Sequence, residues 1–88
     1  MNVFKYYVDV VTLILKDGVL QPLAVVWMDR RYKVDKVLSV RETYSKAGGS
    51  GICYRCLFGG QERSLFWERN RWFLESETFI PELLEKNH

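Results

Sequence analysis

The apolar residues of this chain alternate with polar ones over most of its length, and the pattern has a period of two rather than 3.6. Alternation of this kind places apolar side chains on one face of an extended strand, whereas an amphipathic helix repeats every 3.6 residues. Val, Ile, Tyr, Phe, Trp and Thr, which favour strands, are frequent in these segments. We therefore expect six strands, at residues 3–15, 20–28, 32–43, 52–58, 63–69 and 71–75.

The connections between these segments are typical of hairpins. Residues 16–19 include Gly18, which supplies the positive φ that a tight turn requires, and residues 29–31 and 59–61 form two further turns. The apolar phase slips by one residue near Asp35-Lys36, where a β-bulge would bend the strand. Six strands in this order predict an all-β antiparallel meander that closes into a small barrel or a strongly bent sheet. An open sheet with a C-terminal helix on one face is the alternative.

The length of 88 residues corresponds to one domain. We expect residues 1–76 to form a single β domain and residues 77–88 to form an acidic tail, with one short helix at residues 82–87 that begins near Pro81. Because 48% of the residues are hydrophobic, a disordered chain is excluded. The same surplus leaves large apolar side chains for a surface that another chain covers.

Charge is unevenly distributed although the net value is only +2. Residues 30–71 contain ten Lys and Arg against four Asp and Glu, whereas residues 72–88 contain one Lys against four Glu. This asymmetry predicts an anionic partner, or a tail that folds back on the basic segment. The first apolar run is too short to cross a membrane, and neither a signal peptide nor a disulfide framework is indicated. The expected location is the cytoplasm, with no membrane contact.

A catalytic or metal site is not indicated. Cys53 and Cys56 have the spacing of a zinc or redox pair, but residues i and i+3 of a strand face opposite sides of a sheet. The one histidine is His88, the last residue, so no internal imidazole is available to activate a serine. The Gly-rich loop at 46–51 leads into a strand, whereas a P-loop leads into a helix. We therefore predict that the protein is not an enzyme and uses no cofactor or metal.

Arginine and aromatic residues are interleaved between Arg63 and Phe73. On a small β-barrel this pattern is typical of single-stranded nucleic acid binding, in which bases stack on rings and phosphates contact cations. The same pattern arises when Leu65, Trp67, Trp72 and Leu74 fill a core and the arginines lie outside. The candidate binding surface consists of Trp27, Tyr32, Arg63, Trp67, Arg69, Arg71 and Trp72.

Residues 6–75 carry a set of positions that resembles a family of short uncharacterised bacterial proteins. The positions are Pro22-Leu23, Trp27, Asp29, 31–38, 46–49, Gly51-Ile52, Tyr54, Cys56, Glu62, Leu65-Phe66, Glu68, 71–73 and Glu75. The chain departs from the family at Arg30, where the family tends to have Gly, at Cys53, where it has a basic residue, and at Arg55, where it has Thr. The resemblance implies no activity, but it directs attention to a shared polar network of Asp29, Asp35, Tyr54 and Arg71.

These observations predict a small non-enzymatic binding module. Association with a protein, including a second copy of the chain, is the first hypothesis, because an aromatic-rich sheet with an unpaired strand edge is suited to pairing. Nucleic-acid binding by residues 63–73 is the second hypothesis. An enzyme is the third and would require a concave cavity with convergent polar groups.

Overall fold

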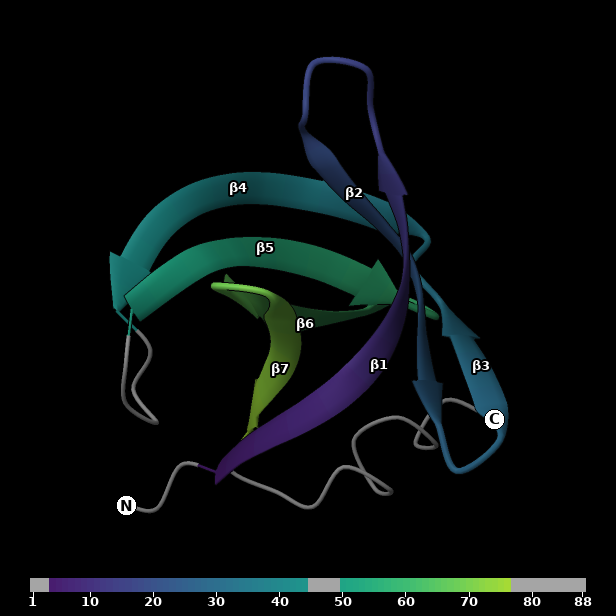
Figure 1. Cartoon of the computed structure of the whole chain (residues 1–88). Coiled ribbons are helices and arrows are strands. Elements are labelled where there is room, and N and C mark those ends of the chain that lie inside the picture. Colours follow the sequence, from purple (N-terminus) through teal and green to yellow (C-terminus); the bar gives the residue numbers. More distant parts are fainter. Residues whose placement is uncertain (1–3, 45–49, 77–88) are drawn as a thin grey trace.

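Seven antiparallel strands form one strongly curled sheet in the computed structural model, which describes residues 4–44 and 50–76 (Figure 1). The strands occur in the sheet in the order β3-β2-β1-β7-β6-β5-β4. The prediction of an all-β, antiparallel and strongly bent sheet is confirmed. The strands are β1 (Phe4–Ile14), β2 (Leu20–Trp27), β3 (Arg30–Lys33), β4 (Lys36–Tyr44), β5 (Ser50–Phe58), β6 (Gln61–Glu68) and β7 (Arg71–Ser76).

The prediction of six strands is wrong, because the third expected strand is two strands. Val34 and Asp35 separate β3 from β4, and their backbone amides donate to different neighbours. The Val34 amide donates to the Leu23 carbonyl of β2 (2.9 Å), whereas the Asp35 amide donates to the Leu57 carbonyl of β5 (2.8 Å). At this corner the chain thus passes from one edge strand of the sheet, β3, to the other, β4. The sheet must curl to bring its two edges together, and it forms a half-barrel.

The turn expected at residues 29–31 lies one residue earlier. Met28 and Asp29 occupy the two central positions, with φ of 50° and 63°, and Trp27 pairs with Arg30. Two positive φ angles are the pattern of a type I′ turn, which matches the twist of a hairpin. Arg30 therefore begins β3, and a glycine at that position is not needed for the turn.

Irregular pairing accompanies the bends. The register shifts between Val11 and Thr12 of β1, opposite Leu23 of β2, and again between Val37 and Ser39 of β4. Pro22 stands beside the first shift, where a missing amide donor disturbs the ladder least. The predicted bulge at Asp35-Lys36 corresponds to the β3–β4 break, and the register shift in β4 follows it.

One face of the sheet, here named the inner face, carries the main core. Two of its aromatic side chains are buried with their polar atoms bonded: Trp72 Nε1 donates to Thr12 Oγ1 (3.1 Å), and the Tyr54 hydroxyl donates to the Leu20 carbonyl (3.3 Å). These bonds link β7 and β5 to the β1–β2 hairpin. The buried residues of this core are Val25, Val34, Tyr54, Cys56, Phe58, Leu65, Trp72 and Leu74.

The expected helix at residues 82–87 and the rest of the acidic tail, 77–88, lie outside the described residues, as do residues 45–49 of the Gly-rich loop. Residues 4–44 and 50–76 contain strands and turns and no helix. Accordingly, no helix in these ranges is long and apolar enough to cross a membrane.

Candidate interaction surfaces

The aromatic members of the predicted binding surface lie on the inner face. Trp67 pairs with Trp72 across β6 and β7, and their ring centroids are 5.0 Å apart. Trp72 belongs to the main core, and Trp67 packs partly buried against it. Trp27 and Tyr32 pack against the same core from β2 and β3. Most of the aromatic surface expected from the sequence is therefore occupied by contacts within the domain.

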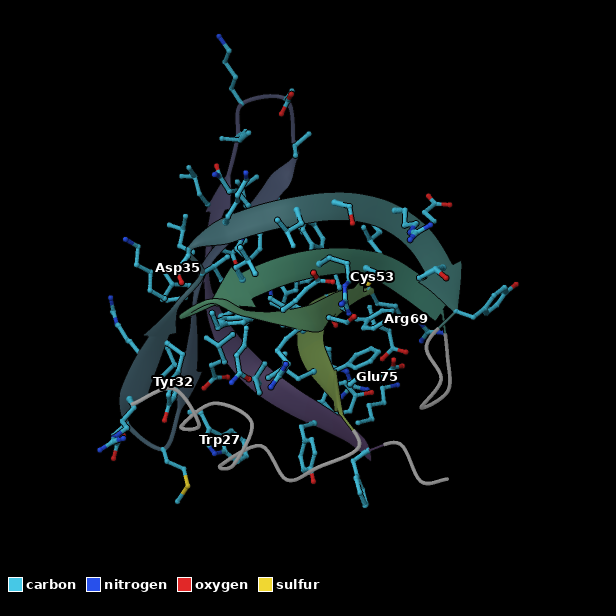
Figure 2. All side chains as sticks on the ribbon, turned by 180° about the vertical axis from the view of Figure 1, so that it is seen from behind. Trp27, Tyr32, Asp35, Cys53, Arg69 and Glu75 are labelled. Carbon is cyan, nitrogen blue, oxygen red and sulfur yellow. The ribbon has the colours of Figure 1, made fainter. Side chains whose placement is uncertain are left out.

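The three arginines of that predicted surface lie apart from one another, and of the three only Arg69 lines a groove together with a tryptophan, Trp67. Arg71 lies over the ring of Tyr7, with its Cζ atom 3.8 Å from the centroid. Arg63 is half-buried and donates to the Glu62 carbonyl (2.8 Å) and to the side chain of Gln61. Arg69 is exposed in the β6–β7 turn, and Figure 2 shows it on the opposite side of the molecule from Trp27 and Tyr32.

The four residues of the expected polar network have separate partners. Asp29 lies in the β2–β3 turn, and Asp35 accepts a hydrogen bond from the Gly59 amide (2.6 Å). The Tyr54 hydroxyl bonds to Leu20 in the core, and Arg71 lies over Tyr7. The structure therefore does not bring these four side chains together.

The opposite, outer face carries a polar and aromatic cluster that the sequence did not indicate. Glu68 accepts a hydrogen bond from the Tyr7 hydroxyl (2.9 Å) and forms an ion pair with Lys5 (3.2 Å). These hydrogen bonds, that from Tyr7 first, lower the pKa of Glu68 below its ordinary value. Lys5 also lies 4.4 Å from the ring centroid of Phe73, and Phe73 stacks on Phe66 at 4.9 Å. Because its charges are paired, this outer cluster joins β1 to β6 and β7 rather than offering free groups to a ligand.

The two cysteines are free and lie on opposite faces. Cys56 is in the main core, whereas Cys53 packs with Phe66 and Phe73 on the outer face. This arrangement agrees with the strand geometry expected from their spacing. Burial raises the pKa of the Cys56 thiol to about 12. No group of three or more His, Cys, Asp or Glu in the described ranges is placed to hold a metal.

We expect Cys56 of the folded protein to resist alkylation. With a pKa near 12, only about one thiol in 10⁴ is ionised at about pH 8, and the thiolate is the reactive form. Alkylation followed by mass spectrometry of peptides should show Cys56 unmodified in buffer and fully modified in denaturant. Rapid modification without denaturant would contradict the buried placement of this thiol.

The β1–β2 hairpin projects beyond the curled sheet (Figure 1). Its strands stay paired to the tip, where the Leu15 amide donates to the Val19 carbonyl (2.8 Å). Because the tip extends past the barrel, its apolar side chains have little to pack against. Their exposed fractions range from 38 to 67%. We name these side chains the hairpin surface: Leu13, Ile14, Leu15, Val19 and Leu23.

A groove of about 520 Å³ opens where β4 ends, β5 begins and β6 ends. Across these strands Glu42 pairs with Ile52, and Ile52 pairs with Trp67, so the three side chains form one row. Arg69 lies in the turn that follows β6, with φ of 58°. We name this site the rim groove; its lining is Glu42, Thr43, Tyr44, Gly51, Ile52, Trp67 and Arg69.

The rim groove holds two of the predicted binding residues, Trp67 and Arg69, and adds Glu42 and Tyr44, which sequence reasoning missed. Tyr44 is 83% exposed. Their position at the end of β4 was readable from the sequence, but their proximity to Trp67 depends on the β4–β5–β6 register.

No family model matches the chain, and the searches of curated proteins and of solved structures found no significant match. The resemblance to short bacterial proteins therefore stays a prediction.

Proposed function

We propose that this protein is an association module that pairs with a second copy of itself through the hairpin surface. The observation that carries the proposal is the gathering of five exposed large apolar side chains on one projecting hairpin. Three of them, Leu13, Leu15 and Val19, lie on the same face of the hairpin, because alternate residues of a strand and directly paired residues share a face. They are 45%, 38% and 52% exposed, and an exposed apolar patch on a monomer is often functional. Covering this area with a partner would remove the apolar surface from water.

The charges at the hairpin tip favour a second copy as the partner. Lys16 and Asp17 are adjacent, and the Asp17 carboxylate accepts a hydrogen bond from the Val19 amide (3.1 Å). In a two-fold contact between antiparallel tips, Lys16 of one copy meets Asp17 of the other. The symmetry then repeats the same contact with the two copies exchanged, so that two ion pairs form. An apolar stripe that ends in a self-complementary pair of charges supports self-association.

Neither edge strand of the sheet is well suited to pairing with a strand of a second copy, which favours the hairpin surface as the site of contact. The β3 edge is short and carries Arg30, Arg31 and Lys33, which discourage pairing with another strand. The β4 edge is longer, but the register shift near Leu38 interrupts it. Beyond this shift a symmetric pairing centred on Arg41 or Glu42 would oppose like charges.

We place this association in the cytoplasm of a bacterium, in agreement with the resemblance and with two free thiols. Nucleic-acid binding by residues 63–73 as a whole receives less support. Trp67 and Trp72 pack against each other, and Arg71 is engaged by Tyr7.

The test is the molar mass of the protein by size exclusion with light scattering over a range of concentrations. We expect a reversible dimer, and we expect Leu13→Gln combined with Val19→Thr to weaken it by at least about tenfold, since two buried apolar side chains contribute more than 1.4 kcal/mol. Lys16→Glu should weaken it less, by like-charge contact at the tip.

Met28→Gln is the matched control, because Met28 is 76% exposed at the tip of the β2–β3 hairpin, outside the hairpin surface. This variant should dimerise as the unmodified protein does. A monomer at every concentration would refute the proposal, as would equal dimerisation of the Leu13/Val19 variant and the control. Circular dichroism of each variant shows whether the sheet is retained.

A further inference from the structure

The rim groove combines an apolar and aromatic lining with two charged groups. Trp67, Tyr44 and Ile52 supply the rings and the apolar side chain, and among the described residues of the lining Arg69 supplies a cation and Glu42 a carboxylate. A volume of about 520 Å³ falls in the range of small-molecule sites. Such a lining suits a planar ligand with an anionic group at one end.

Arg69 and Glu42 are available to a ligand. Neither has an ion pair or a side-chain hydrogen bond to another residue in the described part of the chain, whereas Arg55 is paired with Glu62 and Arg71 lies over Tyr7. Arg69 also has φ of 58° at a turn position that favours glycine. A non-glycine residue held in this conformation, with a free side chain at the mouth of a groove, is an arrangement typical of functional sites.

We propose that the rim groove binds a guanine nucleotide, either free or as one unit of a single strand. The base stacks on the exposed ring of Tyr44 and on the accessible part of the Trp67 ring, as bases do in single-strand binding proteins. Arg69 pairs with the phosphate, for which a guanidinium has matching donors. The Glu42 carboxylate accepts hydrogen bonds from the ring N–H and the exocyclic amine of guanine, whereas adenine presents an acceptor beside its amine.

The surrounding charge also favours an anion over a zwitterionic peptide. Residues 30–71 contain ten Lys and Arg against four Asp and Glu. Such an excess raises the local concentration of anionic ligands. The rim groove lies on β4, β5 and β6, away from the hairpin surface, so this proposal does not depend on dimerisation.

The test is a titration with GMP, AMP and inorganic phosphate, followed by tryptophan fluorescence and by the amide NMR signals of Gly51 and Arg69. We expect GMP to bind at about 1 mM or tighter, to shift both amides, and to bind better than AMP. Phosphate alone should not shift the Gly51 amide. A short oligonucleotide with one guanine distinguishes the two sources: tighter binding than GMP identifies a single strand, and equal binding identifies the free nucleotide.

Arg69→Gly is the decisive variant, because it removes the guanidinium and also relieves the positive φ, so stability should be kept or increased. We expect its affinity for GMP to fall by about tenfold, the loss of one charge-assisted contact. Arg31→Ala is the matched control: Arg31 is exposed on β3, outside the groove lining, and its removal changes the net charge equally. Glu42→Gln should remove the preference for GMP over AMP.

The absence of saturable binding of GMP and of the oligonucleotide at about 10 mM would overturn the proposal. Equal weakening by Arg69→Gly and Arg31→Ala would also overturn it, since it would show attraction by overall charge alone. NMR shifts confined to residues outside the rim groove would likewise overturn the proposal.

Discussion

The Trp72→Ala variant is expected to lose about 4 kcal/mol of unfolding free energy, which is most of the stability of a domain of this size. Trp72 is 4% exposed and lies at the centre of the inner face. Its ring meets Tyr54 edge-on at 5.1 Å, and its Nε1 donates to Thr12. The truncation therefore removes a large buried ring, an aromatic pair and a side-chain hydrogen bond between β7 and β1.

Urea unfolding followed by circular dichroism measures this loss without relying on tryptophan emission. Trp27→Phe is the comparison, because Trp27 Nε1 is buried and has no hydrogen-bond partner among the described residues. Removing an unbonded donor costs little, so this variant should stay within about 1 kcal/mol of the unmodified protein. Trp72→Phe should lose more, since it also leaves Thr12 without its donor. Similar stability of Trp72→Ala and Trp27→Phe would contradict the central role of Trp72.

The Gly51→Ala variant is expected to destabilise the protein by about 2 kcal/mol and to lower its melting temperature by roughly 10 °C. A Cβ atom on Gly51 would lie 2.5 Å from the carbonyl oxygen of Trp67 and 3.3 Å from its carbonyl carbon. These are backbone atoms of β6, which cannot rotate away as a flexible side chain can. The strands β5 and β6 must therefore separate at the rim groove.

Gly60→Ala is the control for the effect of any alanine in a glycine position. At Gly60 an added Cβ meets nothing within 4 Å, but φ is 86°, so only backbone strain is introduced. We expect this strain to cost about 1 kcal/mol. The melting temperatures of the two variants compare the cost of a steric conflict, in Gly51→Ala, with the cost of backbone strain, in Gly60→Ala. A melting temperature of Gly51→Ala equal to that of the unmodified protein would show that β5 and β6 do not approach as closely as described.

Much of the fold was predictable because its signals are local. Alternation located the parts of the chain that form strands, although it merged β3 and β4 into one, and Gly18 and Gly59-Gly60 marked two hairpin turns, since positive φ depends on the residue at the turn. A core of Leu65, Trp67, Trp72 and Leu74 was one of the two alternatives that the sequence left open, because alternation places these four side chains on one face. The break at Val34–Asp35 was visible only as a phase slip, because β2 and β5 determine where the strand ends.

The candidate site was less predictable. The pattern of residues 63–73 does not indicate which face of the hairpin is covered, and the structure places Trp67 and Trp72 inward and Arg71 over Tyr7. Asp35 and Arg71 were expected to meet, but they lie on elements that contact Gly59 and Tyr7 instead. The rim groove joins residues of β4 and β6 that are far apart in the sequence.

The sequence by itself determined that the chain forms short antiparallel strands with tight turns, and that cysteines three residues apart on a strand face opposite sides. Both follow from the conformation of consecutive residues, which neighbours along the chain control. Only the tertiary structure decided that the β1–β2 hairpin projects with its apolar residues uncovered and that Trp67 and Arg69 line one groove. Exposure and proximity depend on the curl and register of the whole sheet, and these arise from contacts between distant segments.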